Sequence, residues 1–274
     1  MKFGISTFIT DLSIRPAPLG RALEERGFDS VFIAEHSHIP AARQSPYPSG
    51  GELPDRYYRT LDPFVALTAV ATVTERLLVG TGVALISQRD PIHTAKEVAS
   101  LDLISGGRAL FGVGVGWNRE EMANHGTDFT TRGRLVNERL RAITALWTEE
   151  KAEFHGEFVD FDPVYAWPKP VRKPHPPIFV GGGRRAFPRV AEFGDAWLAN
   201  SVPPEALGPQ IEELRAVAGR DIPVTVFAAP AEPGAIEGYA ALGVERVLLY
   251  LPSDPEQEAL AHLDRFAGIA ARFR

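Results

Sequence analysis

The sequence contains no cysteine, no long hydrophobic run and no cluster of basic residues. The lack of cysteine excludes disulfide bridges, zinc–thiolate sites and a cysteine nucleophile. No apolar run reaches the roughly 18 residues of a membrane-spanning helix, and the N-terminal "MKFGISTF" lacks the apolar core of a secretory signal. A net charge of −6 without a Lys/Arg run argues against nucleic-acid binding. We therefore expect a cytoplasmic protein with no membrane and no nucleic-acid partner.

Several common catalytic and nucleotide-binding motifs are missing as well. There is no G-x-S-x-G nucleophile elbow, so Ser/His/Asp hydrolysis has no support. There is no G-x-x-x-x-G-K-[ST] phosphate loop. The run "GVGVGW" (112–117) spaces its glycines as G-x-G-x-G inside an apolar stretch. It therefore differs from the G-x-G-x-x-G turn that binds dinucleotides.

What the sequence does contain is a regular alternation of short apolar runs with helical patterns along its 274 residues. The apolar runs predict eight strands, at 2–7, 28–36, 77–85, 109–117, 178–183, 195–200, 222–228 and 247–252. Apolar strands separated by helices are typical of a parallel sheet. The length suits a (β/α)8 barrel, which commonly needs about 250 residues. We expect an α/β protein, a single TIM barrel domain over residues 1–274, with a doubly wound sheet as the alternative.

Two segments interrupt the alternation. Residues 37–60, after the second strand, form a long loop rich in proline, glycine and serine, and such loops are often lids over functional sites. The stretch "FHGEFVDF" (154–161) predicts an excursion or hairpin before the fifth strand. Since functional groups of these barrels lie at the C-terminal ends of the strands, those ends are where we expect the site.

Glycine is unusually frequent at three of these strand ends. The positions are Gly80 and Gly82, then Gly112, Gly114 and Gly116, and finally Gly181 to Gly183. Glycine weakens a strand interior, because it packs nothing and loses the most backbone entropy. The alternatives are tight packing within the barrel or a face left bare for a flat ligand, and recurrence in three strands favours the ligand. On this view Gly116→Val keeps the barrel folded but weakens ligand binding.

The stretch "VGGGRRAFPRV" predicts a phosphate site. A glycine-rich turn opens directly into a helical pattern over residues 184–193. Free N–H groups and the macrodipole at a helix N-terminus bind phosphate, and Arg184 and Arg185 add charge and donors. The alternative is an ordinary flexible turn with solvated arginines.

The stretch "AEHSH" places Glu35, His36 and His38 at the end of the second strand. Histidine exchanges protons near neutral pH, so His36 is our catalytic candidate. The H-x-H spacing also suggests a metal site. The other strand ends supply no further ligands, since the fifth ends in glycine and the sixth in Asn200. We therefore expect no metal.

The sequence resembles the luciferase-like monooxygenase superfamily, and more narrowly its actinobacterial branch of oxidoreductases that depend on the deazaflavin coenzyme F420. The matching segments are "GFDSVFIAEH", "LLVGTGVAL", "DPIHTAKEVASLDLISGGRALFGVGVGWNREE", "RGRLVNERLRAITALWTEEKAEFHGEFVDF" and "PIFVGGGRRAFPRVAEFGDAWLAN". They cover most of the first 200 residues, and the remainder matches only in the order of elements. The block "SGGR…GVGVGW" followed by "FHGEF" is specific to this group.

The resemblance implies a (β/α)8 barrel with a flavin or deazaflavin across its mouth and His36 near the reactive ring. The implied cofactor contacts are Glu35, Gly82, Val83, Gly116, Trp117, Gly182, Gly183 and Arg184. Gly82-Val83 matches the place where relatives hold a non-prolyl cis peptide. Relatives that oxidise sugar phosphates carry a glutamate where this chain has Trp117, which argues against that reaction.

Three functions stay open at this point. The first is hydride transfer between reduced F420 and a small organic substrate, and the resemblance favours it. The second is an FMN-dependent monooxygenase on the same barrel, and the third is a non-catalytic cofactor-binding barrel. We expect F420 as the cofactor, with FMN as the alternative, a small-molecule substrate and a homodimer.

Overall fold

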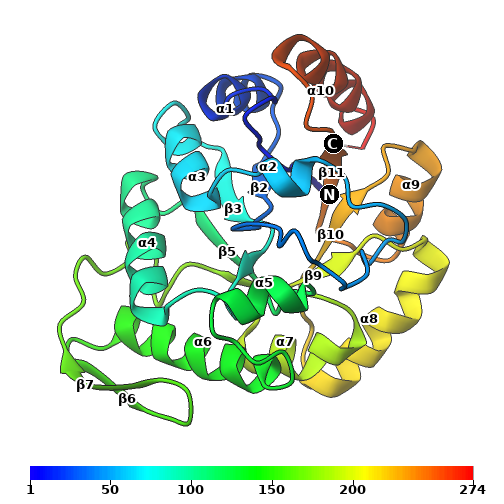
Figure 1. Cartoon of the computed structure of the whole chain (residues 1–274). Coiled ribbons are helices and arrows are strands. Elements are labelled where there is room, and N and C mark those ends of the chain that lie inside the picture. The colour runs from blue at the N-terminus through cyan, green and yellow to red at the C-terminus, as the bar shows by residue number, and fades with distance from the viewer. Residues whose placement is uncertain (274) are drawn as a thin grey trace.

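Parallel strands form one closed sheet in the computed structural model, which describes residues 1–273 (Figure 1). The strands are β1 (Lys2–Thr7), β2 (Ser30–Ile33), β3 (Leu78–Thr81), β4 (Ala84–Leu85), β5 (Ala109–Gly114), β8 (Ile178–Gly181), β9 (Ala196–Asn200), β10 (Val224–Ala229) and β11 (Arg246–Leu251). Each corresponds to one of the predicted apolar runs, and the run at 77–85 supplies both β3 and β4.

The pairing of β3 and β4 with β5 closes the barrel. Val79 of β3 pairs with Ala109, and Ala84 of β4 pairs with Val113 further along the same strand. β3 and β4 thus share one barrel position, interrupted at Gly82 and Val83, and the barrel has eight positions. A doubly wound sheet would leave two free edges, so the closed pairing excludes that alternative. The predicted TIM barrel is confirmed.

A ring of helices surrounds the strands in Figure 1. They are α1 (Pro16–Glu25), α3 (Pro63–Ala71), α4 (Pro91–Ile104), α6 (Arg132–Thr148), α7 (Phe187–Phe193), α8 (Pro204–Ala218), α9 (Pro233–Ala241) and α10 (Glu256–Ala270). Proline often opens them, because its fixed φ suits a first turn whose N–H would lack a partner anyway. The Asp62 carboxylate caps α3, accepting hydrogen bonds from the N–H groups of Phe64 and Val65.

The main apolar core lies between the strands and the helices, and a smaller one fills the barrel interior. The interior core includes Phe32, Leu110, Phe179 and Leu248, all buried. The ring of Phe32 occupies the space beside Gly80, where a Cβ atom would lie 2.9 Å from the ring. This glycine therefore serves packing inside the barrel.

The glycine-rich turn after β8 leads into a helical segment. A 3-10 turn, η1 (Arg184–Ala186), follows Gly183, and α7 begins only at Phe187. The helical pattern predicted over residues 184–193 is therefore present, and its first turn is a 3-10 helix.

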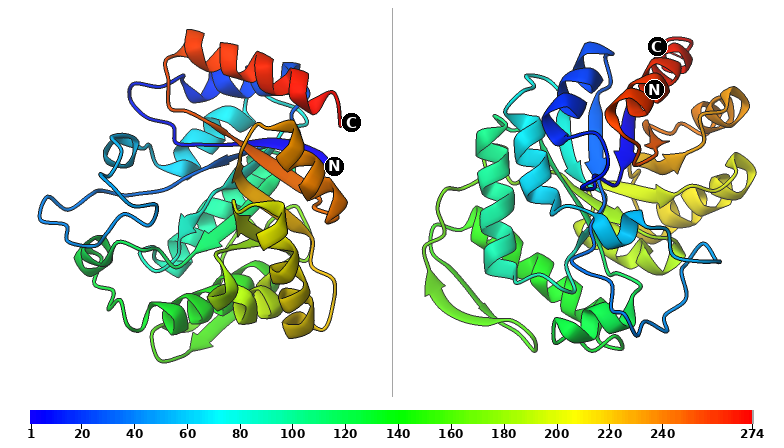
Figure 2. Two further views of the ribbon diagram at one scale, coloured as in Figure 1. Left: turned by 90° about the vertical axis from the view of Figure 1, so that its right-hand side faces the viewer. Right: turned by 45° about the horizontal axis from the view of Figure 1, so that its top comes forward.

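The loop at 37–60 lies across the end of the barrel opposite the two termini, as the left panel of Figure 2 shows. It contains a short helix that the sequence did not predict, α2 (Arg56–Arg59), and it lies beside α5 (Arg119–Asn124). The Glu120 carboxylate accepts a hydrogen bond from the N–H of Ser45, and Thr60 bridges to Thr10. The loop is thus tied to the barrel at both of its ends.

The excursion at 154–161 is an antiparallel hairpin of β6 (Ala152–His155) and β7 (Asp160–Val164), as predicted. It projects from the outside of the barrel, away from the strand ends (Figure 1). No helix within residues 1–273 is long and apolar enough to cross a membrane.

Candidate functional site

A cavity of about 380 Å³ opens at the C-terminal ends of the strands. Its wall is largely apolar side chains and glycine backbone. It brings together the predicted residues Glu35, His36, Gly82, Val83, Gly116, Trp117 and Gly182. The loop at 37–60 contributes Pro48 and Tyr57 to the same wall. We call this space the mouth cavity.

His36 presents one ring nitrogen to a buried acid. Its Nδ1 lies 2.7 Å from Oε2 of Glu121, and the two side chains are 5% and 0% exposed. The His36 ring centre also lies 5.1 Å from that of Tyr57 and 5.7 Å from that of Trp117. Within residues 1–273, no hydrogen bond of the protein uses Nε2. That nitrogen is therefore the one available to a bound molecule.

The protein holds Glu121 in its ionised form. Burial raises the pKa of this carboxyl, but hydrogen bonds from His36 and from the N–H of Ser37 outweigh that effect, and the pKa falls below its ordinary value. The Ser37 N–H donates to Oε1 at 3.0 Å. An ionised carboxylate only accepts hydrogen bonds, so Nδ1 of His36 carries a proton and Nε2 is the ring nitrogen left for a bound molecule.

Sequence reasoning missed Glu121. It lies 85 residues from His36, and the stretch Asn118-x-x-Glu121 matches the pattern of a helix start. The first hydrogen bond of that pattern is present, since Oδ1 of Asn118 accepts from the N–H of Glu121 at 3.3 Å. The carboxylate, however, turns to His36 and Ser37. An acidic residue in the first turn after a barrel strand was the only available signal.

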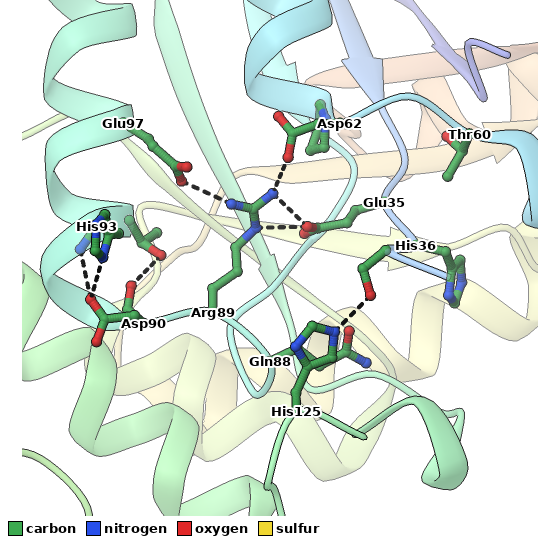
Figure 3. Close-up of a pocket in the computed structure, with 13 residues that line it drawn as sticks. Glu35, His36, Thr60, Asp62, Gln88, Arg89, Asp90, His93, Glu97 and His125 are labelled. Atoms are coloured by element: carbon green, nitrogen blue, oxygen red, sulfur yellow. Dashed lines mark hydrogen bonds and ion pairs between the residues drawn. The ribbon is translucent and has the colours of Figure 1, made fainter. Parts of the chain in front are cut away.

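The carboxylate of Glu35 is already bound on both oxygens. Oε2 accepts from the N–H of Leu85 at 2.7 Å, and Oε1 accepts from Nε of Arg89 at 2.6 Å. Arg89 also contacts Asp62 and Glu97, so one guanidinium serves three carboxylates, as Figure 3 shows. Burial lowers the pKa of Arg89, but these carboxylates reverse that effect and raise it. Glu35 thus ties β2 to β4, and its direct contact with a cofactor stays a prediction.

The glycines of β5 do not leave a bare face for a ligand. A Cβ atom at Gly112 would lie 1.8 Å from the carbonyl oxygen of Thr81, and one at Gly114 would lie 2.5 Å from Cγ2 of Val83. Gly181 makes similar room for Val83, at 3.0 Å from its Cγ1. The empty positions are filled by the protein's own neighbouring strand and by Val83. The predicted ligand slot is wrong for Gly112, whereas Gly114 and Gly181 make room for Val83 and line the mouth cavity together with it.

The backbone conformation at position 116 also favours glycine. It lies beyond the end of β5 with a φ of +73°, a conformation that side chains with a Cβ rarely adopt. A Cβ atom there would lie 2.7 Å from the methyl carbon of Met122. Valine at this position therefore meets backbone strain and has to displace the end of the Met122 side chain, and the expectation that Gly116→Val keeps the barrel folded stays a prediction.

The predicted phosphate residues lie at the border of the site. Gly182 lines the mouth cavity, whereas Gly183 and Arg184 lie outside its wall. At Gly183 nothing lies within 4 Å of the place where a Cβ would sit, so its surface is open. Arg184 is exposed, and its Nε donates to Oε2 of Glu213 at 2.5 Å. The phosphate site stays a prediction.

The two histidines of the H-x-H pair turn to different partners. His36 binds Glu121, whereas Nε2 of His38 lies 2.9 Å from Nδ2 of Asn124. Across the described part of the chain, no three histidine, aspartate or glutamate side chains cluster in a way that would hold a metal ion.

Comparison with known proteins places the chain in a family. The model of the luciferase-like monooxygenase family matches residues 15–233. The chain belongs to this family. A luciferase-like relative from Mycobacterium tuberculosis, an uncharacterised protein, is 40% identical over 277 residues, which cover 98% of each chain. The FMNH2-dependent dimethylsulfone monooxygenase of Pseudomonas putida is 33% identical over 154 residues, 55% of this chain and 42% of that one.

Solved structures share the luciferase-like barrel over its full length. The monooxygenase RslO1 from Streptomyces bottropensis superposes with a TM-score of 0.82 at 20% identity, covering 100% of this chain and 99% of that one. An F420-dependent secondary alcohol dehydrogenase, solved with an F420–acetone adduct, gives 0.77 at 18% identity and covers 100% of both chains. At these identities the likeness establishes the fold.

The cis peptide that the resemblance implied is present in this luciferase-like barrel. The bond between Gly82 and Val83 is cis, at the interruption between β3 and β4. Val83 lines the mouth cavity beside Gly114 and Gly181.

Proposed function

We propose that this luciferase-like barrel is an F420-dependent oxidoreductase that transfers hydride between the reduced cofactor and a small organic substrate. One observation carries the proposal: the His36–Glu121 pair lies at the wall of an apolar, glycine-lined cavity at the barrel mouth. An F420-dependent alcohol dehydrogenase with the same fold supports it.

The residues present suit a deazaflavin. The backbone of Gly82, the side chain of Val83 and the indole of Trp117 would hold the ring in the mouth cavity. The open surface at Gly183, followed by a helical turn whose first N–H groups lack helical partners, would hold the phosphate. When bound, the deazaflavin supplies or accepts the hydride.

The chain itself supplies proton transfer and shelter from water. Hydride transfer changes the charge of the substrate by one unit, and Nε2 of His36 balances it by donating or accepting a proton. The ionised Glu121 accepts a hydrogen bond from Nδ1 of His36 and so fixes the tautomer and orientation of the ring. Tyr57 and Pro48 of the loop at 37–60 cover the cavity and limit the access of water.

An FMN-dependent monooxygenase is the second candidate. The observation that favours it is the 33% identity with the P. putida FMNH2-dependent enzyme over 55% of the chain. The same His36 and the same cavity would serve that reaction.

Fluorescence of Trp117 tests the proposed site. Trp117 lines the mouth cavity, so we expect F420 to quench part of the tryptophan emission on binding, and Trp117→Phe to remove most of that quenching. The control is Trp167→Phe, since Trp167 is 58% exposed and lies outside the cavity wall. Quenching that survives Trp117→Phe unchanged would place the cofactor elsewhere, and an absence of any binding of F420 or FMN would favour a non-catalytic barrel without cofactor.

A further inference from the structure

A second and larger cavity adjoins the mouth cavity. It measures about 900 Å³ and lies between the loop at 37–60, the ends of β10 and β11, and α10. Phe8, Tyr57, Asn200 and Phe227 line both spaces. A molecule with its reacting carbon near His36 therefore has room to extend into this second space, which we call the outer cavity.

The outer cavity is positively charged. Arg56 and Arg265 line it, and no aspartate or glutamate of the described residues does. Arg56 is half-buried, and no carboxylate within residues 1–273 pairs with it; its buried Nε has no hydrogen-bond partner. Arg89, by contrast, meets three carboxylates in the same molecule. A half-buried guanidinium without a counter-ion keeps donors available for an anion.

Aromatic rings hold Arg56 in place without neutralising it. Its guanidinium carbon lies 5.6 Å from the ring centre of Phe8 and 5.5 Å from those of Tyr57 and Tyr250. Such cation–π contacts orient the group and leave its charge intact. Tyr250 also presents a hydroxyl donor, and burial raises its pKa, whereas the Tyr57 hydroxyl donates to that of Tyr47 at 3.4 Å.

We infer that the outer cavity binds an anionic group of the substrate, a carboxylate or a phosphate, with Arg56 as the residue that selects it. The inference rests on the proposed function, because that function places the reacting end of the substrate at His36. The acidic side chain of F420 is another anionic group that the outer cavity could bind. The substrate is favoured because the predicted phosphate turn follows β8, whereas Arg56 faces the ends of β10 and β11.

A matched pair of probes tests the inference without any cofactor. Naphthalene-2-carboxylate and naphthalene-2-carboxamide are titrated calorimetrically into the purified protein. We expect the carboxylate to bind at least about tenfold more tightly, Arg56→Met to abolish that preference and Arg56→Lys to retain part of it. Arg134→Met is the control and should leave the preference unchanged, since Arg134 is exposed and pairs with Glu157 on the outside of the barrel.

Several results would overturn the inference. One is equal binding of the two probes to the wild type, and another is a preference that survives Arg56→Met in a folded protein. If Arg56→Met fails to fold, Arg265→Met serves as the second variant and should weaken carboxylate binding alone. Arg265 is exposed at the rim, so the fold does not depend on it.

A separate titration distinguishes the two sources of the anion. F420 is compared with the same deazaflavin lacking its acidic side chain. We expect Arg56→Met to leave the affinity for both unchanged. A loss confined to full-length F420 would assign the outer cavity to the cofactor and overturn the substrate assignment. A protein that binds FMN but not F420, yet still prefers the carboxylate probe, would contradict the proposed function and support this inference.

Discussion

His36→Ala is expected to lower turnover by about 10²–10⁴-fold, the usual contribution of a general acid–base group, while the fold and the affinity for the cofactor are retained. The reason is that His36 lines the mouth cavity with Nδ1 held by Glu121 at 2.7 Å, which leaves Nε2 as the proposed acid–base atom. Turnover is followed as oxidation of the reduced cofactor by a substrate that the wild type accepts, and cofactor binding is measured on the same preparation.

Two further variants make this test specific. Glu121→Gln replaces the ionised carboxylate that orients the His36 ring through Nδ1, so it should lower turnover while the fold is retained. His38→Ala is the matched control, because His38 turns to Asn124 instead of the mouth cavity, and its turnover should stay close to that of the wild type. A folded His36→Ala protein with unchanged turnover would remove His36 from the mechanism.

Gly112→Val should destabilise the protein by more than about 4 kcal/mol, and Gly112→Ala should be nearly as harmful. The Cβ of either residue would lie 1.8 Å from the carbonyl oxygen of Thr81. This oxygen belongs to the backbone of β3, directly before the interruption of that strand, and the Thr81 hydroxyl also donates to the carbonyl of Gly112 at 2.6 Å. Relief of the clash therefore requires β3 to separate from β5.

Chemical unfolding of the variants measures the effect. The control is Gly268→Ala in α10, where nothing lies within 4 Å of the added Cβ, and there we expect a gain of about 0.5–1 kcal/mol from helix propensity. If Gly112→Ala were as stable as this control, β3 and β5 would have to lie further apart than in the structure, and the packing role of this glycine would be wrong.

The barrel could be predicted from the sequence because each strand is a short apolar run bounded by polar or glycine-rich turns. The helices likewise carry their own signals, such as Asp62 before Pro63. Only the resemblance to the family pointed to a special backbone at Gly82-Val83, where β3 ends and β4 has not yet begun. The residues themselves continue the same apolar run. Nothing in local propensity distinguishes a continuous strand from two short ones.

The site was predictable where strand ends define it and unpredictable where loops do. His36 and Trp117 lie three residues beyond the ends of β2 and β5, so the position of the strands was sufficient to find them. Glu121 and Arg56 lie on short helices whose docking depends on contacts between distant parts of the chain. A glycine in the sequence shows that a side chain is missing, but it does not show what occupies the space. At Gly112 the expected ligand is replaced by the carbonyl oxygen of Thr81.

We propose that the mouth cavity binds a deazaflavin in preference to a flavin. The most direct test is a side-by-side calorimetric titration of the wild-type protein with F420 and FMN, each in oxidised and reduced form. We predict micromolar binding of F420 and at least tenfold weaker binding of FMN, a difference of about 1.4 kcal/mol or more. Micromolar binding of FMN with no detectable binding of F420 would contradict the account and assign the protein to FMN-dependent chemistry.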